Sequence, residues 1–396
     1  MNKRPFIILS AFLLLFSLIE KGQATETYRP ETSVAGFIQL PGSGRQVYNF
    51  NPGWRFFRGD VRGAEVVNFD DRSWNVVSTP HTVELMPAEG SGCRNYQGPA
   101  WYRKHFVLPA ETKGKRVVLH FEAAMGKQIL YLNGKRIQEH LGGYLPFTLD
   151  LTANGVQAGD SCLLAVFTDN SDDKSYPPGK RQYTLDFAYH GGIYRDVWMI
   201  AKSPVAITDA IDSQTVGGGG VFIHFDKISE KSAQVYVNTE VQNDDARSES
   251  VTVETTLTDA DGKVIKRSSG KLSLKPGEKK SICQQMEVKN PTLWSPDTPY
   301  LYRVQSRIKK GNKSIDGGIT RVGIRLAEFR GKDGFWLNGK PFGQLVGANR
   351  HQDFAYVGNA LPNSQQWRDA KRLRDVGCTI IRVCLLYTSP SPRDCS

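Results

Sequence analysis

Much of the chain consists of short segments in which apolar and polar side chains alternate, separated by turn dipeptides. In "RVVLHF", Val117, Leu119 and Phe121 recur at every second position, as a half-buried strand requires. The next such segment, residues 129–132, leads into Asn133-Gly134, a dipeptide that tolerates the positive φ angles of a tight hairpin. Asp261-Gly262 and Asn338-Gly339 repeat this arrangement. Short strands joined by such turns predict β-sandwiches.

A second β-rich stretch runs from about Val205 to Arg325, with the glycine run "VGGGG" a little inside its start. We place a domain boundary just before this stretch, near Ser203, so two separate sandwiches are expected. The chain has 396 residues, of which 39% are hydrophobic and 23% charged, and this leaves room for two or three globular cores.

From Gly347 onward the pattern changes to that of one helix between two strands. The segment "SQQWRDAKRLRDVG" carries apolar residues at three-residue spacing, with Asn363 or Ser364 available as N-cap and Gly377 as the C-terminal stop. The apolar run that opens at Leu345 precedes this helix, and the β-branched "TIIRV" follows it. A strand, a helix and a strand in succession normally pair in parallel. The spaced apolar residues are Trp367, Ala370, Leu373 and Val376.

Four polar residues, "RHQD" from Arg350 to Asp353, follow the first of these two strands. The simplest interpretation of such a strand end is a loop that leads to solvent. Ligands of parallel α/β structures, however, collect at the carboxyl ends of the strands, and His351 lies at such an end. The pattern therefore favours His351 as a ligand-binding residue.

The net charge of +11 raises the question of a nucleic-acid partner. Lys and Arg are interleaved with Asp and Glu, and the clear basic run, Lys263 to Lys280, is typical of a solvated face. We find no nucleic-acid-binding motif and expect no nucleic-acid partner. The cysteines lack CxxC spacing, which indicates neither a zinc site nor a dense disulfide framework. They are Cys93, Cys162, Cys283, Cys378, Cys384 and Cys395.

Residues 1–24 have the organisation of a signal peptide. Lys3 and Arg4 precede an apolar stretch, Phe6 to Ile19, which is too short for a comfortable membrane span. Small residues at Gly22 and Ala24 suit signal peptidase, so cleavage after Ala24 is expected. The sequence thus predicts an exported bacterial protein, periplasmic or secreted, with no membrane attachment after cleavage.

Seven segments together resemble family 2 glycoside hydrolases of the bacterial β-galactosidase type. The resemblance covers nearly all of the mature chain and implies three parts. These are a jelly-roll sugar-binding domain at residues 46–203, an immunoglobulin-like sandwich at residues 204–325 and the start of a (β/α)8 catalytic barrel at residues 326–384. The segments are "FNPGWRFFRGD", "FDDRSWNVVSTPHTVEL", "WYRKHFVLP", "YLNGKRIQEHLGGYLPFTLDL", "GGIYRDVWMI", "LWSPDTPYLYRV" and "GFWLNGKPFGQLVGANRHQDF".

The resemblance implies roles for individual residues. His351 matches the histidine that the family directs at the sugar in the −1 subsite, and Asp186 matches an acidic residue that a loop of the first domain contributes to the same subsite. Asp169 is a second, weaker match for that role. Carboxylates and imidazoles suit sugar hydroxyls chemically, but either aspartate could instead bind loop amides. We interpret Trp294 and Tyr302 as sandwich core and His81 and His190 as structural.

The catalytic residues themselves are not present in this chain. Retaining hydrolysis needs two carboxyl groups about 5 Å apart. In the family both are glutamates on later barrel strands. Between Leu326 and Val383 the sequence has one glutamate, Glu328, which precedes the first barrel strand. No catalytic residue can therefore be named, and this chain is expected to be inactive; the resemblance implies neither a cofactor nor a metal.

The intact parent would be a retaining exo-glycosidase that acts on carbohydrates with terminal β-linked sugars, β-galactosides first. β-Glucuronidase or β-mannosidase specificity is an open alternative, as is a homo-oligomeric parent. A different class of function, a non-catalytic carbohydrate-binding protein made of the two sandwiches, also stays open. From residue 385 the sequence no longer resembles the family and has the character of translated adaptor sequence, the alternative being a natural Ser/Pro-rich tail.

Overall fold

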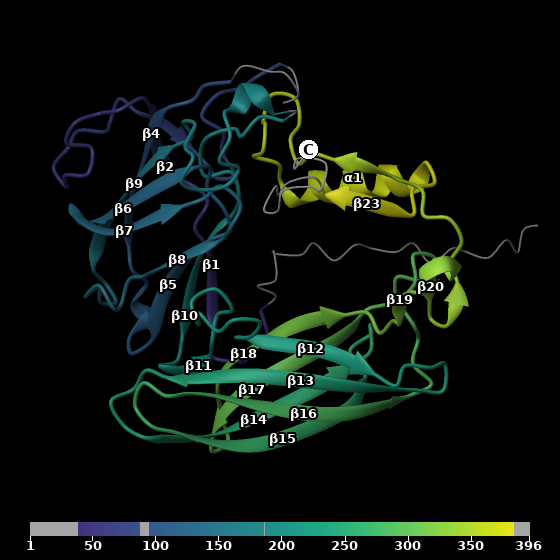
Figure 1. Ribbon diagram of the computed structural model, residues 1–396. Helices are drawn as coiled ribbons and strands as arrows, with labels where there is room; N and C mark the ends of the chain where they lie inside the picture. Colours follow the sequence, from purple (N-terminus) through teal and green to yellow (C-terminus); the bar gives the residue numbers. More distant parts are fainter. Residues whose placement is uncertain (1–38, 88–94, 186, 384–396) are drawn as a thin grey trace, which may run out of the picture. The chain divides into compact units, whose positions relative to one another are not determined.

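The computed structural model describes residues 39–87, 95–185 and 187–383 (Figure 1). The predicted signal peptide, the tail from residue 385, and Asp186 lie outside these ranges. Strands dominate the described part, with one α-helix, α1 (Asn363–Asp375), and three 3₁₀ turns at Ala110–Thr112, Gln182–Thr184 and Gly331–Asp333. Among these helical segments, none has the length and apolar character needed to cross a membrane.

The first sandwich consists of two antiparallel sheets, with strand orders β3-β2-β4-β9-β6-β7 and β1-β10-β5-β8. Its core lies between the sheets, because buried Trp54 and Tyr102 from one sheet and Leu119 and Phe121 from the other belong to one apolar cluster. This is the predicted jelly roll. The strands are β1 (Gln46–Asn49), β2 (Trp54–Arg58), β3 (Asn75–Val77), β4 (Pro99–Val107), β5 (Arg116–Phe121), β6 (Lys127–Leu132), β7 (Lys135–Leu141), β8 (Phe147–Asp150), β9 (Ser161–Asp169) and β10 (Val197–Lys202).

The second sandwich has the predicted immunoglobulin-like character. One sheet runs β11-β13-β12 with β16 also paired to β13, and the other runs β15-β14-β17-β18 (Figure 1). Alternate residues of β13, among them Val235 and Val237, pack against Tyr302 and Val304 of β17. The strands are β11 (Val205–Ile207), β12 (Val221–Asp226), β13 (Ser232–Asn243), β14 (Glu249–Thr258), β15 (Val264–Leu274), β16 (Lys279–Lys289), β17 (Tyr302–Lys310) and β18 (Lys313–Val322).

Two of the three predicted tight hairpins form as expected. Asn133 and Gly134 have φ angles of 50° and 83°, and Asn338 and Gly339 have 53° and 76°. At the third, only Gly262 has a positive φ, 88°. The connection there spans five residues, because the Asp259 carboxylate accepts hydrogen bonds from the amides of Asp261 and Lys263. A side chain outside the dipeptide therefore determines that turn.

Strand β5 departs from the prediction of a half-buried strand. Val117, Leu119 and Phe121 face the core, but Val118 and His120 on the opposite face are also buried, each 6% exposed. That opposite face lines a cavity of about 310 Å³ together with residues that follow β11, such as Asp209. Alternation along one strand cannot reveal that both of its faces are covered.

The C-terminal part contains a small antiparallel sheet of β19 (Ala327–Phe329), β20 (Phe335–Leu337) and β21 (Lys340–Pro341). It then forms the predicted strand, helix and strand: β22 (Gly347–Arg350) and β23 (Ile380–Val383) pair in parallel, with α1 between them. Gly377 ends the helix region with a φ of 90°.

The predicted N-cap of α1 is wrong. Pro362 occupies the N-cap position without a side-chain cap, and Asn363 is the first helical residue. Its side-chain amide nitrogen donates to Asp196 Oδ2 at 3.2 Å. The apolar side of the helix remains largely uncovered in the described part, since Trp367 is 44% and Val376 79% exposed.

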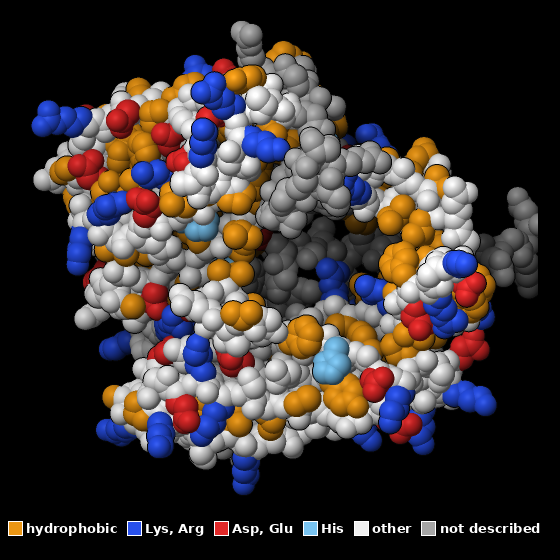
Figure 2. All heavy atoms as spheres, in the orientation of Figure 1, with side chains coloured by type: hydrophobic (Ala, Val, Ile, Leu, Met, Phe, Trp, Pro, Cys, Tyr) orange, Lys and Arg blue, Asp and Glu red, His pale blue; other side chains and the backbone are white. Residues whose placement is uncertain are grey.

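Charges of both signs are interspersed on the face of the molecule that Figure 2 shows. On the face shown in Figure 2, Lys and Arg side chains alternate with Asp and Glu over the strands of both sandwiches. No broad single-sign field is visible on that face, which is what a solvated, mixed-charge surface looks like.

Candidate substrate-binding site

His351 directly follows the carboxyl end of β22, as the sequence predicted. Its ring centroid lies 5.9 Å from that of Phe187, at an interplanar angle of 50°. Phe187 belongs to the first sandwich, in the segment that leads into β10. The structure therefore brings the strand-end histidine against the domain that resembles a sugar-binding module.

The loop after His351, residues 352–361, is held to the first sandwich by Arg195. One guanidinium nitrogen, Nη1, donates to the carbonyl oxygens of Asn359 and Leu361 at 3.1 and 3.2 Å. The other, Nη2, donates to Gln352 Oε1 at 2.8 Å. Burial lowers the pKa of Arg195 from its ordinary value, but an arginine remains charged.

Two further contacts hold the middle of this loop. Tyr356 pairs through its backbone with Met86, whose amide donates to the Tyr356 carbonyl at 3.2 Å. Gly358 lies flat against the ring of His190, so that a Cβ at this position would come within 2.4 Å of the imidazole. Its φ of 52° is a second reason for glycine.

The same loop places a carboxylate near a buried histidine. Asp353 Oδ2 lies 3.9 Å from His190 Nε2, which is too long for a direct hydrogen bond. His190 is only 2% exposed and its Nε2 has no hydrogen-bond partner within the described ranges. The sequence assigned His190 a structural role, and its packing under Gly358 is consistent with one.

The two predicted aspartates have different outcomes. Asp169 ends β9, and its carboxylate accepts a hydrogen bond from the Ser171 amide at 2.8 Å, which is the loop-amide role given above as the alternative. Asp186 lies outside the described residues, although its neighbour Phe187 contacts His351. Their roles as sugar ligands thus stay predictions.

Asp172, which the sequence did not single out, binds three residues of the loops around β4 and β10. Asp172 Oδ1 accepts hydrogen bonds from Gln97 Nε2 and the Gln182 amide, each at 2.9 Å, and from the Tyr189 hydroxyl. Burial raises its pKa, but these hydrogen bonds outweigh burial and the net pKa is lowered. The motif "FTDNSDD" contained this residue, yet nothing in its spacing distinguished it from Asp169.

Tyr302, Trp294 and His81 have different surroundings in the structure. Tyr302 is buried in the second core, 3% exposed, as predicted. Trp294 is only partly buried and carries the Arg325 guanidinium over its ring at 4.9 Å, so it lies at the rim rather than in the core. His81 is hydrogen-bonded through Nδ1 to the buried Tyr102 hydroxyl at 2.8 Å, which makes it structural.

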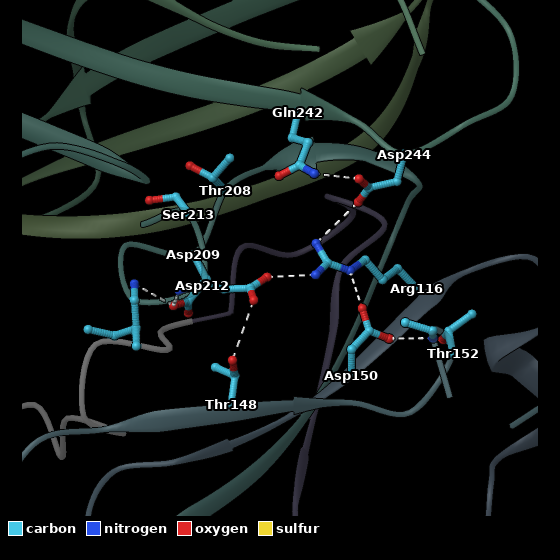
Figure 3. Close-up of polar contacts among 12 residues, drawn as sticks. Arg116, Thr148, Asp150, Thr152, Thr208, Asp209, Asp212, Ser213, Gln242 and Asp244 are labelled. Carbon is cyan, nitrogen blue, oxygen red and sulfur yellow. Dashed lines mark hydrogen bonds and ion pairs between the residues drawn. The ribbon is translucent and has the colours of Figure 1, made fainter. Parts of the chain in front are cut away.

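A second polar cluster links the two sandwiches (Figure 3). Arg116 of β5 donates to Asp150 of β8 and to Asp212, both at 2.6 Å, and to Asp244 at 3.1 Å. Asp212 and Asp244 belong to the second sandwich, so one guanidinium spans both domains. Burial alone would lower the pKa of Arg116, but the three carboxylates raise it. In the described part of the chain, no three His, Cys, Asp or Glu side chains are grouped to hold a metal ion.

Comparison with known proteins gives the architecture a context. The family profile "Glycosyl hydrolases family 2, sugar binding domain" matches residues 66–204, and "Glycosyl hydrolases family 2" matches residues 219–325. Together these ranges make up more than half of the chain.

Curated relatives include proteins named β-glucuronidase and proteins named β-galactosidase. The chain is 32% identical to a β-glucuronidase of Formosa agariphila and 34% identical to a β-galactosidase of Thermoanaerobacter pseudethanolicus. The alignments cover 90% and 86% of this chain but only 37% and 43% of those proteins. A solved structure of Bacteroides uniformis β-glucuronidase 2, covalently bound to cyclophellitol-6-carboxylate aziridine, matches with a TM-score of 0.77 and 32% identity over 86% of this chain and 40% of that one.

Proposed function

Because this chain belongs to glycosyl hydrolase family 2, we propose that its parent protein is an exported, retaining exo-β-glycosidase and that His351 binds the terminal sugar. The observation that carries the proposal is the position of His351, at the carboxyl end of β22 and against Phe187 of the sugar-binding domain. Ligands of parallel α/β units bind at this end of the strands. Export rests on the leader sequence, residues 1–24.

The reaction would proceed in two steps through a covalent glycosyl-enzyme. One carboxylate attacks the anomeric carbon while a carboxylic acid protonates the leaving oxygen, and water then releases the sugar. The covalently modified Bacteroides uniformis relative supports this mechanism by analogy. Glu328 is unsuited to either role, because it lies before β22 and pairs with Arg330 at 2.6 Å. Both catalytic carboxylates would come from the part of the parent that the chain does not span.

Among substrates, β-galactosides are our first choice and β-glucuronides the second. A glucuronide carries a carboxylate that calls for a free cation nearby. Arg350, next to His351, is paired with Asp369 at 2.5 Å, and Arg195 is engaged by the 352–361 loop. These contacts favour a neutral sugar, whereas the β-glucuronidases among the relatives favour the uronate.

The test is an assay of the parent with its complete barrel on nitrophenyl β-galactoside, β-glucuronide and β-mannoside. We expect turnover of the β-galactoside with retention of anomeric configuration. Preference for the glucuronide would select the second candidate. If the source DNA has a genuine stop codon here, and residues 39–325 bind galactosides without any turnover, the non-catalytic carbohydrate-binding alternative is correct.

A further inference from the structure

We propose that Arg195 is a positioning residue that fixes the 352–361 loop and thereby the orientation of His351. The catalytic consequence rests on the proposed function, but the structural claim does not. Arg195 lies in "GGIYRDV", a segment to which the sequence analysis assigned no individual role.

The hydrogen bonds of Arg195 reach both ends of the loop. The acceptors of Arg195 lie at both ends of the loop: Gln352 follows His351 directly, and Asn359 and Leu361 close the loop before α1. A planar guanidinium presents several N–H donors in a rigid fork, so it can tie two chain segments together in one geometry.

Burial makes these bonds difficult to replace. Gln352, Asn359 and Leu361 are 8%, 3% and 1% exposed, so water has little access to their acceptors. Without Arg195, two buried carbonyl groups and one amide oxygen would lose a partner, and the desolvation cost of each unpaired group would oppose the present loop conformation.

The remaining contacts of the loop act elsewhere. The backbone pairing of Tyr356 with Met86 and the packing of Gly358 on His190 hold its middle. Neither involves Gln352, the residue adjacent to His351. The Tyr194 side chain also hydrogen-bonds Gln352, but the guanidinium of Arg195 joins Gln352 to Asn359 and Leu361 at the far end of the loop.

The charge of Arg195 has no direct counter-ion in the described residues, although the carboxyl groups of Glu122 and Asp196 act on it from a longer distance. Within the described ranges no carboxylate forms an ion pair with it, and the nearby Asp196 is occupied by the side-chain amides of Asn51 and Asn363. Its hydrogen-bond acceptors are neutral, and its guanidinium lies 5.3 Å from the centre of the Tyr194 ring. A lysine could reach one end of the loop but could not bridge both.

Hydrogen–deuterium exchange on the full 396-residue chain tests this role without any need for turnover. We compare the unmodified chain with Arg195→Met, Arg195→Lys and Gln352→Leu. The matched control is Arg181→Met, since Arg181 is an exposed arginine of the same sandwich whose side chain contacts Tyr183.

In Arg195→Met we expect the amides of residues 351–361 to exchange roughly tenfold faster or more, with β5 and β13 unchanged. Arg195→Lys should restore part of the protection. Arg181→Met should leave the pattern as it is. Unchanged exchange at 351–361 would overturn the proposal, as would a uniform increase across the whole first sandwich.

If Arg195→Met fails to fold, Gln352→Leu is the second test, because it removes one acceptor of Arg195 and leaves the bonds to Asn359 and Leu361 in place; it also removes the hydrogen bond between Tyr194 and Gln352. We expect faster exchange confined to residues 351–353, and no such change would again overturn the proposal. Histidine-selective NMR gives a second readout: the His351 ring signal should be single and sharp in Arg181→Met and broadened or split in Arg195→Met and Gln352→Leu. These outcomes are separable from a failure of the glycosidase proposal, because neither measurement uses a sugar.

Discussion

At the scale of single residues, His351 has the clearest expected effect on chemistry. As the sugar ring flattens toward an oxocarbenium ion, a hydrogen bond that strengthens in the transition state lowers the barrier. Replacing His351 with alanine in the complete enzyme should therefore lower kcat, at a cost of about 2 to 4 kcal/mol, as for other charge-stabilising donors. Steady-state kinetics with a nitrophenyl β-galactoside measures this, and a normal kcat with a raised KM would show that His351 only binds.

A second residue-scale prediction concerns the pH dependence of stability. Burial raises the pKa of Glu122 from 4.5 to about 7, against a hydrogen bond from Trp198 that lowers it. Between these pH values the folded state holds a proton that the unfolded state has lost, so this group makes stability fall as pH rises. The full shift would correspond to at most about 3 kcal/mol, and less in practice because the side chain is partly exposed.

His81 acts in the opposite direction, because burial lowers its pKa from 6.5 to about 4 and stability then rises with pH in that window. The contribution of the Glu122 carboxyl group is isolated by comparing the unmodified chain with Glu122→Gln. From pH 4.5 to 7 the free energy of unfolding of Glu122→Gln should rise relative to that of the unmodified chain. Outside that range the difference between the two should be constant, as measured by urea unfolding. Glu230→Gln, at a largely exposed side chain, is the control. If the free energy of unfolding varies with pH in the same way in the unmodified chain and in Glu122→Gln, the raised pKa of Glu122 is wrong.

The sequence located His351 but not its supporting residues, and the reason is physical. A polar residue at the end of a predicted parallel strand is a local signal. Two of the three partners of Arg195 are backbone carbonyls 164 and 166 residues further along the chain, and a carbonyl group has no residue identity to detect. Asp172 was missed for a related reason, since its donors lie far from it in the sequence: Gln97 precedes β4, and Gln182 and Tyr189 lie 10 and 17 residues further along the β9–β10 connection.

At the scale of elements, the Arg116 cluster ties β5 and β8 to the second sandwich (Figure 3). Arg116→Met would leave three partly buried carboxylates close together without their shared cation. We expect a loss of about 1 to 3 kcal/mol, somewhat below the cost of breaking a fully buried pair. Calorimetry should show a lower Tm.

Arg72→Met is the matched control for this cluster. Arg72 forms an exposed pair with Asp70, with side chains 86% and 60% exposed, and such pairs contribute little. Equal effects of the two substitutions would mean that the Arg116 cluster has no special role in joining the sandwiches.

Helices and strands were predicted correctly where apolar residues recur at regular spacing. The prediction failed at one helix end and where residues distant in the sequence determine the local structure. The parallel pairing of β22 and β23 followed from the order of strand, helix and strand. The N-cap of α1 did not, because the helix begins earlier than expected, with Pro362 at the N-cap position and Asn363 already helical. Likewise β5 has a second buried face that only the neighbouring residues after β11 explain.

At the scale of the whole molecule, the two sandwiches and the C-terminal part differ in how completely they bury their apolar side chains. Both sandwiches enclose cores from facing sheets. In the C-terminal part, by contrast, α1 has no buried residue, and Val346 and Ile380 are 54% and 44% exposed. The order of the two sandwiches along the chain could be predicted from sequence motifs. The burial of a strand or helix face depends on which other elements cover it, and this the motifs do not show.

The last prediction follows from this contrast: the 396-residue chain should have a protease-resistant core ending near residue 325 and no glycosidase activity. Exposed apolar side chains and short strands with open edges favour local unfolding, so cleavage should occur first around α1 and residues 326–346. The 352–361 loop, held by Arg195, should be cut later than α1. Limited proteolysis with mass spectrometry gives the order of cuts. Turnover of nitrophenyl β-galactoside should not exceed that of buffer, because the described residues offer no catalytic carboxylate pair; hydrolysis that an active-site inhibitor abolishes would prove this wrong.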